Sequence, residues 1–173
     1  MNETLQTLKK RRSIRQFQDK QVSEADLLTV LEAGTYAPSG KGAQSCIIIA
    51  VQNREDVAAL TRMNAAVLGA DTDPYYGAPT ILLILVDRSA ATPVEDGSAV
   101  TTYLLLAAEA IGLGACWINR ERQMFDSAEG KALLRKWGVS GDYLGVAACS
   151  LGYVAGERKE PVPRKADYFR IIK

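Results

Sequence analysis

The sequence predicts an α+β fold in which a central sheet is wrapped by helices, although alternating helices and strands are also compatible with an α/β sheet. Four short apolar runs have the length and composition of strands. Segments with helical spacing of apolar residues separate these runs, and several begin at a capping residue. The 173 residues are enough for one domain with a real core. We therefore expect a single domain over residues 1–173.

Two helices are predicted before the first strand. Residues 4–10 form a short helix with two leucines on one face. Ser23 opens the second helix, because its hydroxyl can cap the first turn and Asp26 follows three positions later. This helix is expected to end near Tyr36, just before a proline.

A basic stretch, residues 9–17, links these helices and holds five of the 21 Lys and Arg residues. Within it, Arg11, Arg12, Ser13 and Arg15 offer guanidinium and hydroxyl donors that suit a phosphate. The alternative is a solvated basic face at the end of a helix, where cations complement the helix dipole. The spacing alone leaves both interpretations open.

The loop at residues 38–44 is the second candidate site. It contains two glycines together with Pro38, Ser39, one lysine and Gln44. Backbone donors in such a loop can hold an anion or the polar edge of a ring, but the spacing is not that of a Walker A motif. The alternative is an ordinary turn.

Residues 45–52 predict a strand that is covered on both faces. Asn53 caps the helix that follows. On that helix, Asn64 lies on or beside the apolar face, where an unpaired amide would cost roughly 1–3 kcal/mol. Asn64 is therefore either bonded to neighbouring groups of the chain or a ligand contact.

The middle of the chain holds a tyrosine pair and a long helix. Tyr75 and Tyr76 lie in a loop, where they either cover a flat ligand or pack on the surface. A strand is expected at residues 80–86, and Asp96 is expected to cap a helix at 97–111. Since that helix is apolar over much of its circumference, it is expected at the centre or at a subunit interface.

The third strand follows Gly112, a suitable residue to end a helix, and runs to residue 118. Within it, Gly114 allows close approach of another group. Asp126 and Glu129 are expected to open a further helix that closes near Gly138. A last strand at 144–154 and a polar tail at 155–173 complete the chain.

Composition excludes several classes of protein. The 21 basic and 20 acidic residues leave a net charge of +1, so no overall field favours nucleic acid or a membrane. The N-terminus lacks the apolar core of a signal peptide, and the apolar runs 47–51 and 81–86 are too short to span a bilayer. We expect a cytoplasmic protein.

The cysteines and histidines narrow the chemistry further. Cys46, Cys116 and Cys149 lie apart in apolar runs, which indicates buried free thiols. The chain has no histidine, so a Ser-His-Asp triad, a histidine metal site and histidine acid–base catalysis are all excluded. An enzyme with this sequence must take much of its chemistry from a cofactor.

The sequence Arg-Arg-Ser-Ile-Arg-Gln-Phe at 11–17 resembles the opening motif of the nitroreductase family of FMN-dependent oxidoreductases. The family's Pro-Ser…Asn-x-Gln-Pro-Trp loop is similar to residues 38–46, with Gly42, Ser45 and Cys46 in place of Asn, Pro and Trp. Ala-Pro before the strand at 80–86 and Gly-Leu-Gly-x-Cys-Trp-Ile at 112–118 continue the resemblance. These motifs occur in the family's order over nearly the whole chain.

The resemblance implies an intertwined homodimer that binds FMN at its interface, with the C-terminal arm reaching the partner. It implies a ping-pong reaction in which NADH or NADPH reduces the flavin, and a nitro compound, a quinone or a similar small acceptor then reoxidises it. No protein side chain is expected to act as a catalytic group. The cofactor-binding residues that it implies, together with the candidates above, are Arg11, Arg12, Ser13, Arg15, Pro38, Ser39, Gln44, Asn64, Gly114, Asn119, Arg120, Arg164 and Lys165.

Two other functions stay open at this point. The same fold hosts flavoenzymes with other end reactions, such as dehalogenation or flavin fragmentation. A non-enzymatic module could instead bind nucleic acid through residues 9–15, although no second basic stripe or row of stacking aromatics supports it. A flavin spectrum separates these classes.

Overall fold

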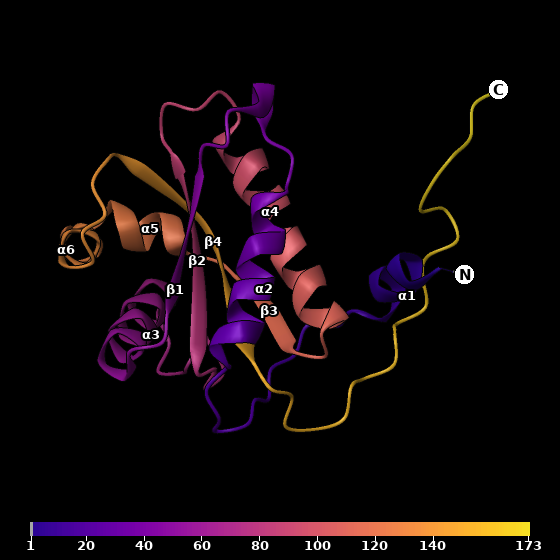
Figure 1. Ribbon diagram of the computed structural model, residues 1–173, viewed down its shortest axis with the longest axis horizontal. Helices are drawn as coiled ribbons and strands as arrows, with labels where there is room; N and C mark the ends of the chain where they lie inside the picture. The colour runs from indigo at the N-terminus through magenta and orange to yellow at the C-terminus, as the bar shows by residue number, and fades with distance from the viewer. Residues whose placement is uncertain (1) are drawn as a thin grey trace.

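The computed structural model describes residues 2–173 and confirms the α+β fold (Figure 1). These residues contain six helices, four strands and one short 3-10 turn, η1. In chain order the elements are α1 (Glu3–Lys10), α2 (Glu24–Thr35), η1 (Gly40–Gly42), β1 (Cys46–Val51), α3 (Arg54–Leu68), β2 (Thr80–Asp87), α4 (Pro93–Ala110), β3 (Gly114–Ile118), α5 (Glu121–Asp126), α6 (Ala128–Lys136) and β4 (Tyr143–Gly152).

The four strands form one sheet in the order β1-β2-β4-β3, and every neighbouring pair is antiparallel. This pattern decides against the α/β alternative, which needs parallel strands. Cys46 of β1 faces Val86 of β2, and Thr80 of β2 faces Leu151 of β4. The register of β2 against β4 shifts once, between Ile84 and Leu85.

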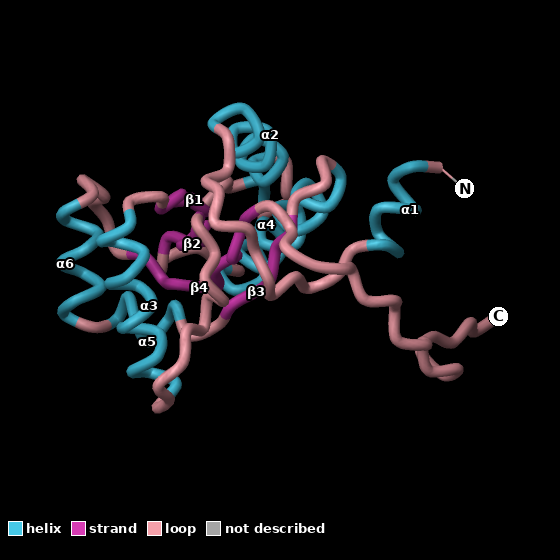
Figure 2. The backbone as a smooth tube through the Cα atoms, turned by 90° about the horizontal axis from the view of Figure 1, so that it is seen from below, coloured by secondary structure: helices cyan, strands magenta, loops and turns pink. Residues whose placement is uncertain are grey.

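The sheet separates two apolar core clusters. Figures 1 and 2 show helices on both faces of the sheet. Because side chains alternate along a strand, β2 supplies both clusters. Leu82 and Ile84 pack with α2 and α4 on one face. Ile81, Leu83 and Leu85 pack with α3, α5 and α6 on the other. Helix α1 lies outside both layers, beside α4 (Figure 1).

Several local predictions are confirmed. The Ser23 hydroxyl accepts a hydrogen bond from the backbone N–H of Asp26, and Asn53 accepts from the first turn of α3. Gly112 follows α4 with a φ of 83°, which glycine adopts without strain. All three cysteines are free, with Cys116 and Cys149 buried and Cys46 half-buried.

Three predictions are wrong. Helix α4 begins at Pro93, so Asp96 lies inside its first turn instead of capping it. A short helix, α5, precedes α6, and Ser127, not Asp126 or Glu129, caps α6. Strand β1 is only half-buried over most of its length, because it is an edge strand.

The start of β4 packs tightly on α5. A Cβ atom added at the buried Gly145 would lie 2.4 Å from the backbone oxygen of Glu121. The backbone cannot give way as a flexible side chain would. Glycine therefore permits the contact between β4 and the first residue of α5.

We expect Gly145→Ala to lower the free energy of unfolding by about 3 kcal/mol, because it overpacks a rigid contact. The melting temperature should fall by roughly 6–12 °C for a domain of this size. Gly156→Ala is the control, since its Cβ would meet only the end of the Gln16 side chain. Thermal unfolding of both variants measures the difference, and equal melting temperatures would contradict the packing argument.

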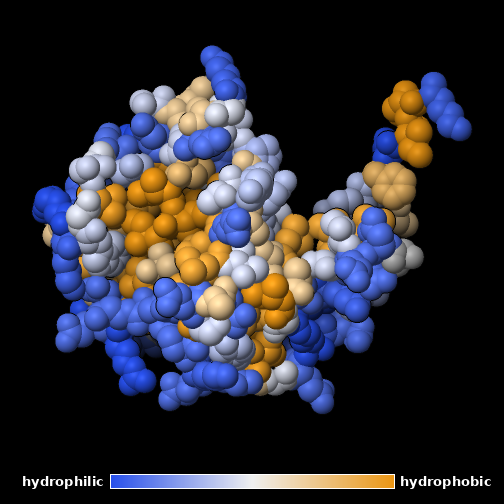
Figure 3. Space-filling model, in the orientation of Figure 1, coloured by the Kyte–Doolittle hydropathy of each residue, from blue (hydrophilic) through white to orange (hydrophobic). Residues whose placement is uncertain are grey.

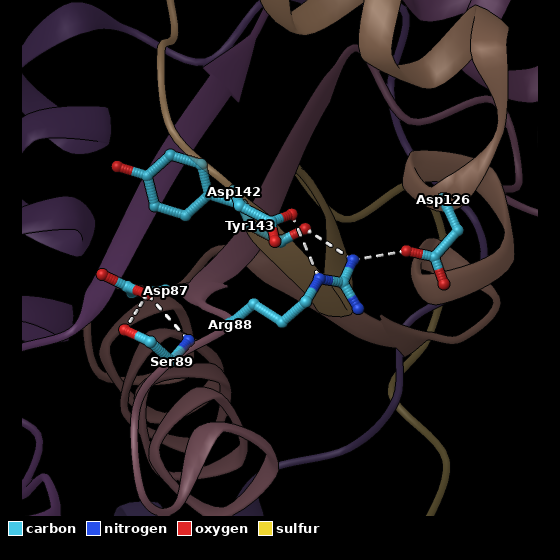
Figure 4. A network of polar contacts seen from close by, with 6 residues as sticks. All are labelled: Asp87, Arg88, Ser89, Asp126, Asp142 and Tyr143. Atoms are coloured by element: carbon cyan, nitrogen blue, oxygen red, sulfur yellow. Dashed lines mark hydrogen bonds and ion pairs between the residues drawn. The ribbon is translucent and has the colours of Figure 1, made fainter.

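A surface network fixes the other end of α5 (Figure 4). Arg88, just after β2, bonds Asp126 at the end of α5 and donates to Asp142 and to the carbonyl oxygen of Tyr143, each at 3.1 Å. These side chains are partly exposed, so each ion pair contributes only about 0.2–1 kcal/mol. The network ties the end of β2 to α5 and to the start of β4.

The tail after β4 has no regular secondary structure and extends away from the sheet, on the same side of the molecule as α1 (Figures 1 and 2). Its first part is anchored by Arg158, which pairs with Glu109 and donates to the carbonyl oxygens of Gly112 and Leu113. Across residues 2–173 no helix has the length and apolarity to cross a membrane.

Candidate functional site

The basic stretch lies against β3, at one edge of the sheet. The backbone N–H of Ile14 donates to the carbonyl oxygen of Ala115 at 3.0 Å, and Ser13 and Ala115 form a parallel bridge. Phe17 then bridges to Val154, just beyond β4. These backbone contacts fix the position of the stretch on the fold.

Arg11, Ser13 and Arg15 gather around the Cys116 thiol of β3. Burial raises the pKa of this thiol, while the charge of Arg15, a hydrogen bond with Ser13 and the charge of Arg11 act to lower it. The three are every second residue, as expected when alternate side chains of an extended segment share a side. They therefore form a cluster on the sheet face that carries α3 and α5.

The Arg12 side chain is not part of this cluster. Its guanidinium donates to the carbonyl oxygens of Lys9 at 2.8 Å, Arg11 at 2.6 Å and Lys159 at 3.2 Å. These bonds join the end of α1 to the tail. Arg12 therefore joins backbone segments of the chain, and no such bond to a carbonyl oxygen is made by Arg11 or Arg15 among the described residues.

The cations of the cluster have no acidic partner among the residues that the structure describes. In residues 2–173 the ion pairs involve Arg88, Lys136 and Arg158, and none involves Arg11 or Arg15. Arg15 instead lies 5.6 Å from the ring centre of Tyr76, which is 40% exposed, and a hydrogen bond with Tyr76 raises the pKa of Arg15. Two uncompensated guanidinium groups and a hydroxyl suit an anion.

Beyond β3 on the same face lies a buried polar cluster centred on Asn64. Its Nδ2 group donates to the Tyr75 hydroxyl, the Asn119 carbonyl oxygen and Glu121 Oε1, at 3.1, 3.0 and 3.3 Å. Its Oδ1 atom accepts from Arg120 Nε at 2.6 Å. Since Asn64 is fully buried, its amide is used within the chain, as the structural alternative predicted.

Glu121 was missed by the sequence interpretation, because an acidic residue in the first turn of a helix is ordinary. Its side chain is fully buried, and Oε2 has no hydrogen-bond partner among the described residues. Oε1 accepts from the Tyr75 hydroxyl at 3.1 Å. Burial raises the pKa of Glu121 to about 7. Nothing in the sequence marks this residue out.

We expect Glu121→Gln to stabilise the protein increasingly as pH rises. A raised folded-state pKa gives stability that is complete below the unfolded value, near 4.5, and lost as pH rises through about 7. Glutamine does not titrate, so its advantage over wild type should widen by roughly 2 kcal/mol between pH 5.5 and 8.5. Thermal unfolding at both pH values measures this, and an advantage independent of pH would show that Glu121 does not titrate there.

Asn119 and Arg120 connect β3 to α5. Both are bonded to Asn64, at the centre of the buried polar cluster. Arg120 has a φ of 87°, a left-handed backbone that glycine favours. Only its Nε atom is bonded: among residues 2–173 no acceptor meets its two Nη atoms. The Asn119 side chain accepts from Trp117 Nε1 at 2.8 Å. The structure therefore places a partly exposed guanidinium beside a buried carboxyl group.

The loop at residues 38–44 is held by Asp96 from α4. Asp96 Oδ1 accepts from the Gly40 backbone N–H at 2.8 Å and Oδ2 accepts from the Ser45 hydroxyl at 2.9 Å. Backbone bonds to the loop lower the pKa of Asp96, so the carboxylate is charged. Lys41 and Gln44 both have positive φ, so the loop backbone is strained.

This loop and the basic stretch lie at diagonally opposite corners of the sheet. The loop enters β1 at Cys46, which is paired across the sheet with Val86 of β2 and, through it, with Leu144 of β4. The basic stretch meets β3 at Ala115, in the row of Leu151 and Thr80 at the other end. Since β1 and β3 are also the two edge strands, one chain keeps the two candidate regions apart.

The remaining candidates are two residues of the tail and Gly114 of β3. Arg164 and Lys165 are exposed in the tail, where Lys165 lies 5.6 Å from the ring centre of Tyr168. Within one chain the structure does not bring them to the basic stretch by any hydrogen bond or ion pair of the described residues. Gly114 leaves room for the side chain of Ile14, 2.7 Å from where its Cβ would be. Among residues 2–173 no cluster of His, Cys, Asp or Glu could hold a metal ion.

Comparisons with known proteins agree with this architecture. A model of the nitroreductase family matches residues 8–153. A protein of Archaeoglobus fulgidus with the provisional name NADH dehydrogenase/NAD(P)H nitroreductase is 32% identical over 165 residues, which cover 91% of this chain and 89% of its own.

Solved structures extend the comparison over the full chain. A nitroreductase from Bacteroides fragilis, crystallised with bound FMN, has a TM-score of 0.91 and 30% identity and covers 100% of both chains. A provisionally described nitroreductase from Desulfovibrio desulfuricans, in complex with FMN, has a TM-score of 0.72 and 28% identity over 96% of this chain and 94% of its own. The chain belongs to the nitroreductase family.

Proposed function

We propose that the protein is an FMN-dependent oxidoreductase that uses NADH or NADPH to reduce a small acceptor such as a nitro compound or a quinone. The observation that carries the proposal is the cluster of Arg11, Ser13 and Arg15, whose cations have no acidic partner within residues 2–173. FMN ends in a phosphate, which supplies the charge that this cluster lacks. Two similar solved structures contain FMN, and the Archaeoglobus relative is named for NAD(P)H.

The residues present have the chemical groups that binding of FMN requires. Arg11 and Arg15 would hold the phosphate, with Ser13 as a further donor. Asn119 and Arg120, at the other end of β3, would lie near the reactive edge of the ring. The distance from Ala115 to Asn119 along the chain is about 13 Å for four extended residues, which leaves room for the ribityl linker.

FMN, when bound, supplies hydride acceptance from the nicotinamide and two-electron transfer to the acceptor. The chain's own groups bind the phosphate, orient the ring and leave one side open for the nicotinamide and then the acceptor. With no histidine in the sequence, no imidazole takes part in proton transfer.

We further propose that the active form is a homodimer in which the second copy supplies the loop at residues 38–44. The separation of this loop from the basic stretch supports it, since a single flavin needs both regions close together. Apolar side chains that a lone chain leaves exposed also support it: Leu5 and Leu8 of α1, and Phe169, Ile171 and Ile172 of the tail. Figure 3 shows a group of apolar atoms near the end of the tail.

A groove of about 1000 Å³ between α1 and α4 is consistent with an interface there. Leu8, Tyr103 and Leu106 line part of it. In the homodimer, Arg164 or Lys165 of the tail would be free to approach a phosphate on the other copy.

The experiment begins with the purified protein. We expect a yellow protein with a flavin spectrum, one FMN per chain by extraction and a dimer by light scattering. Anaerobic stopped-flow mixing with NADH and with NADPH should bleach the flavin absorbance, and an acceptor panel should restore it. A colourless protein that takes up no FMN, or a flavin that neither nicotinamide reduces, would overturn the proposal. A colourless protein that binds nucleic acid would favour the non-enzymatic alternative.

A further inference from the structure

Arg120 is a partly exposed residue that is held by a group of buried polar side chains. Its backbone is left-handed, with a φ of 87°, where glycine would be unstrained. An arginine at such a position costs free energy that glycine would not. The strain is maintained by a neighbouring structure that fixes the residue from several sides.

The support comes from three different parts of the chain. Asn64 of α3 accepts from Arg120 Nε at 2.6 Å and donates to the carbonyl oxygen of Asn119 at 3.0 Å, so one buried amide holds both residues. Tyr75 and Glu121 complete the support, since each bonds Asn64 and they bond one another. All three side chains are at least 99% buried.

This arrangement fixes the guanidinium at Nε and leaves its other end free. Neither Nη atom has an acceptor among residues 2–173, and no carboxylate forms an ion pair with Arg120 there. A guanidinium fixed in this way offers two parallel donors that match a carboxylate. Its pre-organisation reduces the side-chain entropy that binding would otherwise cost.

We infer that Arg120 is a specificity-determining residue that binds a carboxylate of the electron acceptor, and that Asn64, Tyr75 and Glu121 position it. The inference rests on the proposed function, which places Arg120 beside the reactive edge of the ring. The preferred acceptors are then small anionic aromatic compounds. Neutral acceptors of the same shape gain nothing from the guanidinium.

The charge of Glu121 modulates this site. The titratable or charged groups around it are Tyr75, Arg120 and Cys149. Burial raises the pKa of both Tyr75 and Cys149, so they stay neutral near pH 7. Glu121 has a pKa of about 7, so its carboxyl group gains a negative charge as pH rises and offsets the charge of Arg120. Anion binding should therefore be stronger below pH 7 than above it.

The test uses the FMN-loaded protein and two pairs of probes. Benzoate and neutral benzamide are titrated by calorimetry into the oxidised protein, and 4-nitrobenzoate and 4-nitrobenzamide are compared as acceptors. In Arg120→Gln, we expect benzoate affinity and kcat/KM for 4-nitrobenzoate to fall about tenfold or more, because a charge-assisted hydrogen bond is lost. The neutral partners should lose much less, so the ratio of kcat/KM for 4-nitrobenzoate to that for 4-nitrobenzamide should fall by about fivefold or more.

Two further variants separate a binding role from a structural one. Arg122→Ala removes an exposed positive charge two residues away and should leave all four probes as in wild type. Glu121→Gln keeps the size of the side chain and should make benzoate affinity independent of pH between 6 and 8.5. Wild type should bind benzoate more weakly at the upper end of this range.

Equal losses for charged and neutral probes in Arg120→Gln would overturn the inference, as would unchanged benzoate affinity. Loss of FMN without a change in selectivity would make Arg120 a cofactor residue instead. These outcomes differ from failure of the proposed function, in which the wild-type protein takes up no FMN or is not reduced by either nicotinamide.

Discussion

Replacing Arg11 and Arg15 together by alanine is expected to weaken FMN binding by roughly a hundredfold or more and to leave riboflavin binding nearly unchanged. A charge-assisted hydrogen bond contributes roughly 1.5–3 kcal/mol, and each 1.4 kcal/mol is about tenfold in affinity. Neither guanidinium has an acidic partner in residues 2–173, so both are available to the phosphate. Riboflavin lacks the phosphate, so its affinity does not include any contact between these guanidinium groups and a phosphate.

The two single variants should not be equal. Arg15 also stacks on Tyr76, so its removal loses a contact within the chain as well as one to the phosphate. Arg12→Ala should act mainly on stability, because its guanidinium bonds three carbonyl oxygens between α1 and the tail.

Lys9→Ala is the matched control, because it removes one positive charge from the same stretch, on exposed α1. Fluorescence titration of the apoprotein with FMN and riboflavin gives both affinities, and far-ultraviolet circular dichroism shows whether the fold survives. Equal weakening of FMN and riboflavin would mean that the phosphate is bound elsewhere.

Much of the fold follows from local signals in the sequence. Short apolar runs favour strands when turn residues bound them, and β1, β2 and β3 fall on runs of five to eight residues. The ten-residue β4 falls on a longer run that also contains glycine and serine. Ser23 and Asn53 cap helices because their side chains replace missing backbone acceptors. These interactions span a few residues, so the sequence contains all that is needed to predict them.

The errors came from interactions between distant segments. Asp96 has the composition of a cap, but its carboxylate bonds Gly40 and Ser45, more than 50 positions earlier. Glu121 and Asn64 are 57 positions apart and meet only in the folded core. The strand order, which makes β1 an edge, is likewise absent from local spacing.

The sequence indicates which segments form the candidate site but not how these segments are arranged in space. The basic stretch and the loop at residues 38–44 each have a distinctive composition, so both could be singled out. Only the register of the sheet places them at opposite corners. A dimer that shares its sites across the interface would bring the two segments together.

A mixture of two FMN-deficient variants is expected to regain FMN when the two chains pair. One chain carries Arg11→Ala and Arg15→Ala; the other carries Gln44→Trp, whose indole would occupy the ligand side of the loop. In a two-fold dimer that shares sites across the interface, the heterodimer has one doubly altered site and one intact site. Heterodimers isolated with two different tags should therefore hold about half the FMN of wild type, while each homodimer holds almost none.

The inverse arrangement is the decisive control. If all three substitutions are placed in one chain and paired with a wild-type chain, each shared site contains one altered half and FMN should be lost. A site formed within a single chain requires the opposite results: no recovery in the first pairing and about half occupancy in the second. The substitutions are the same in both pairings, so differences in stability or expression cancel. FMN content thus reports directly whether the loop at residues 38–44 acts on the flavin of its own chain or on that of its partner.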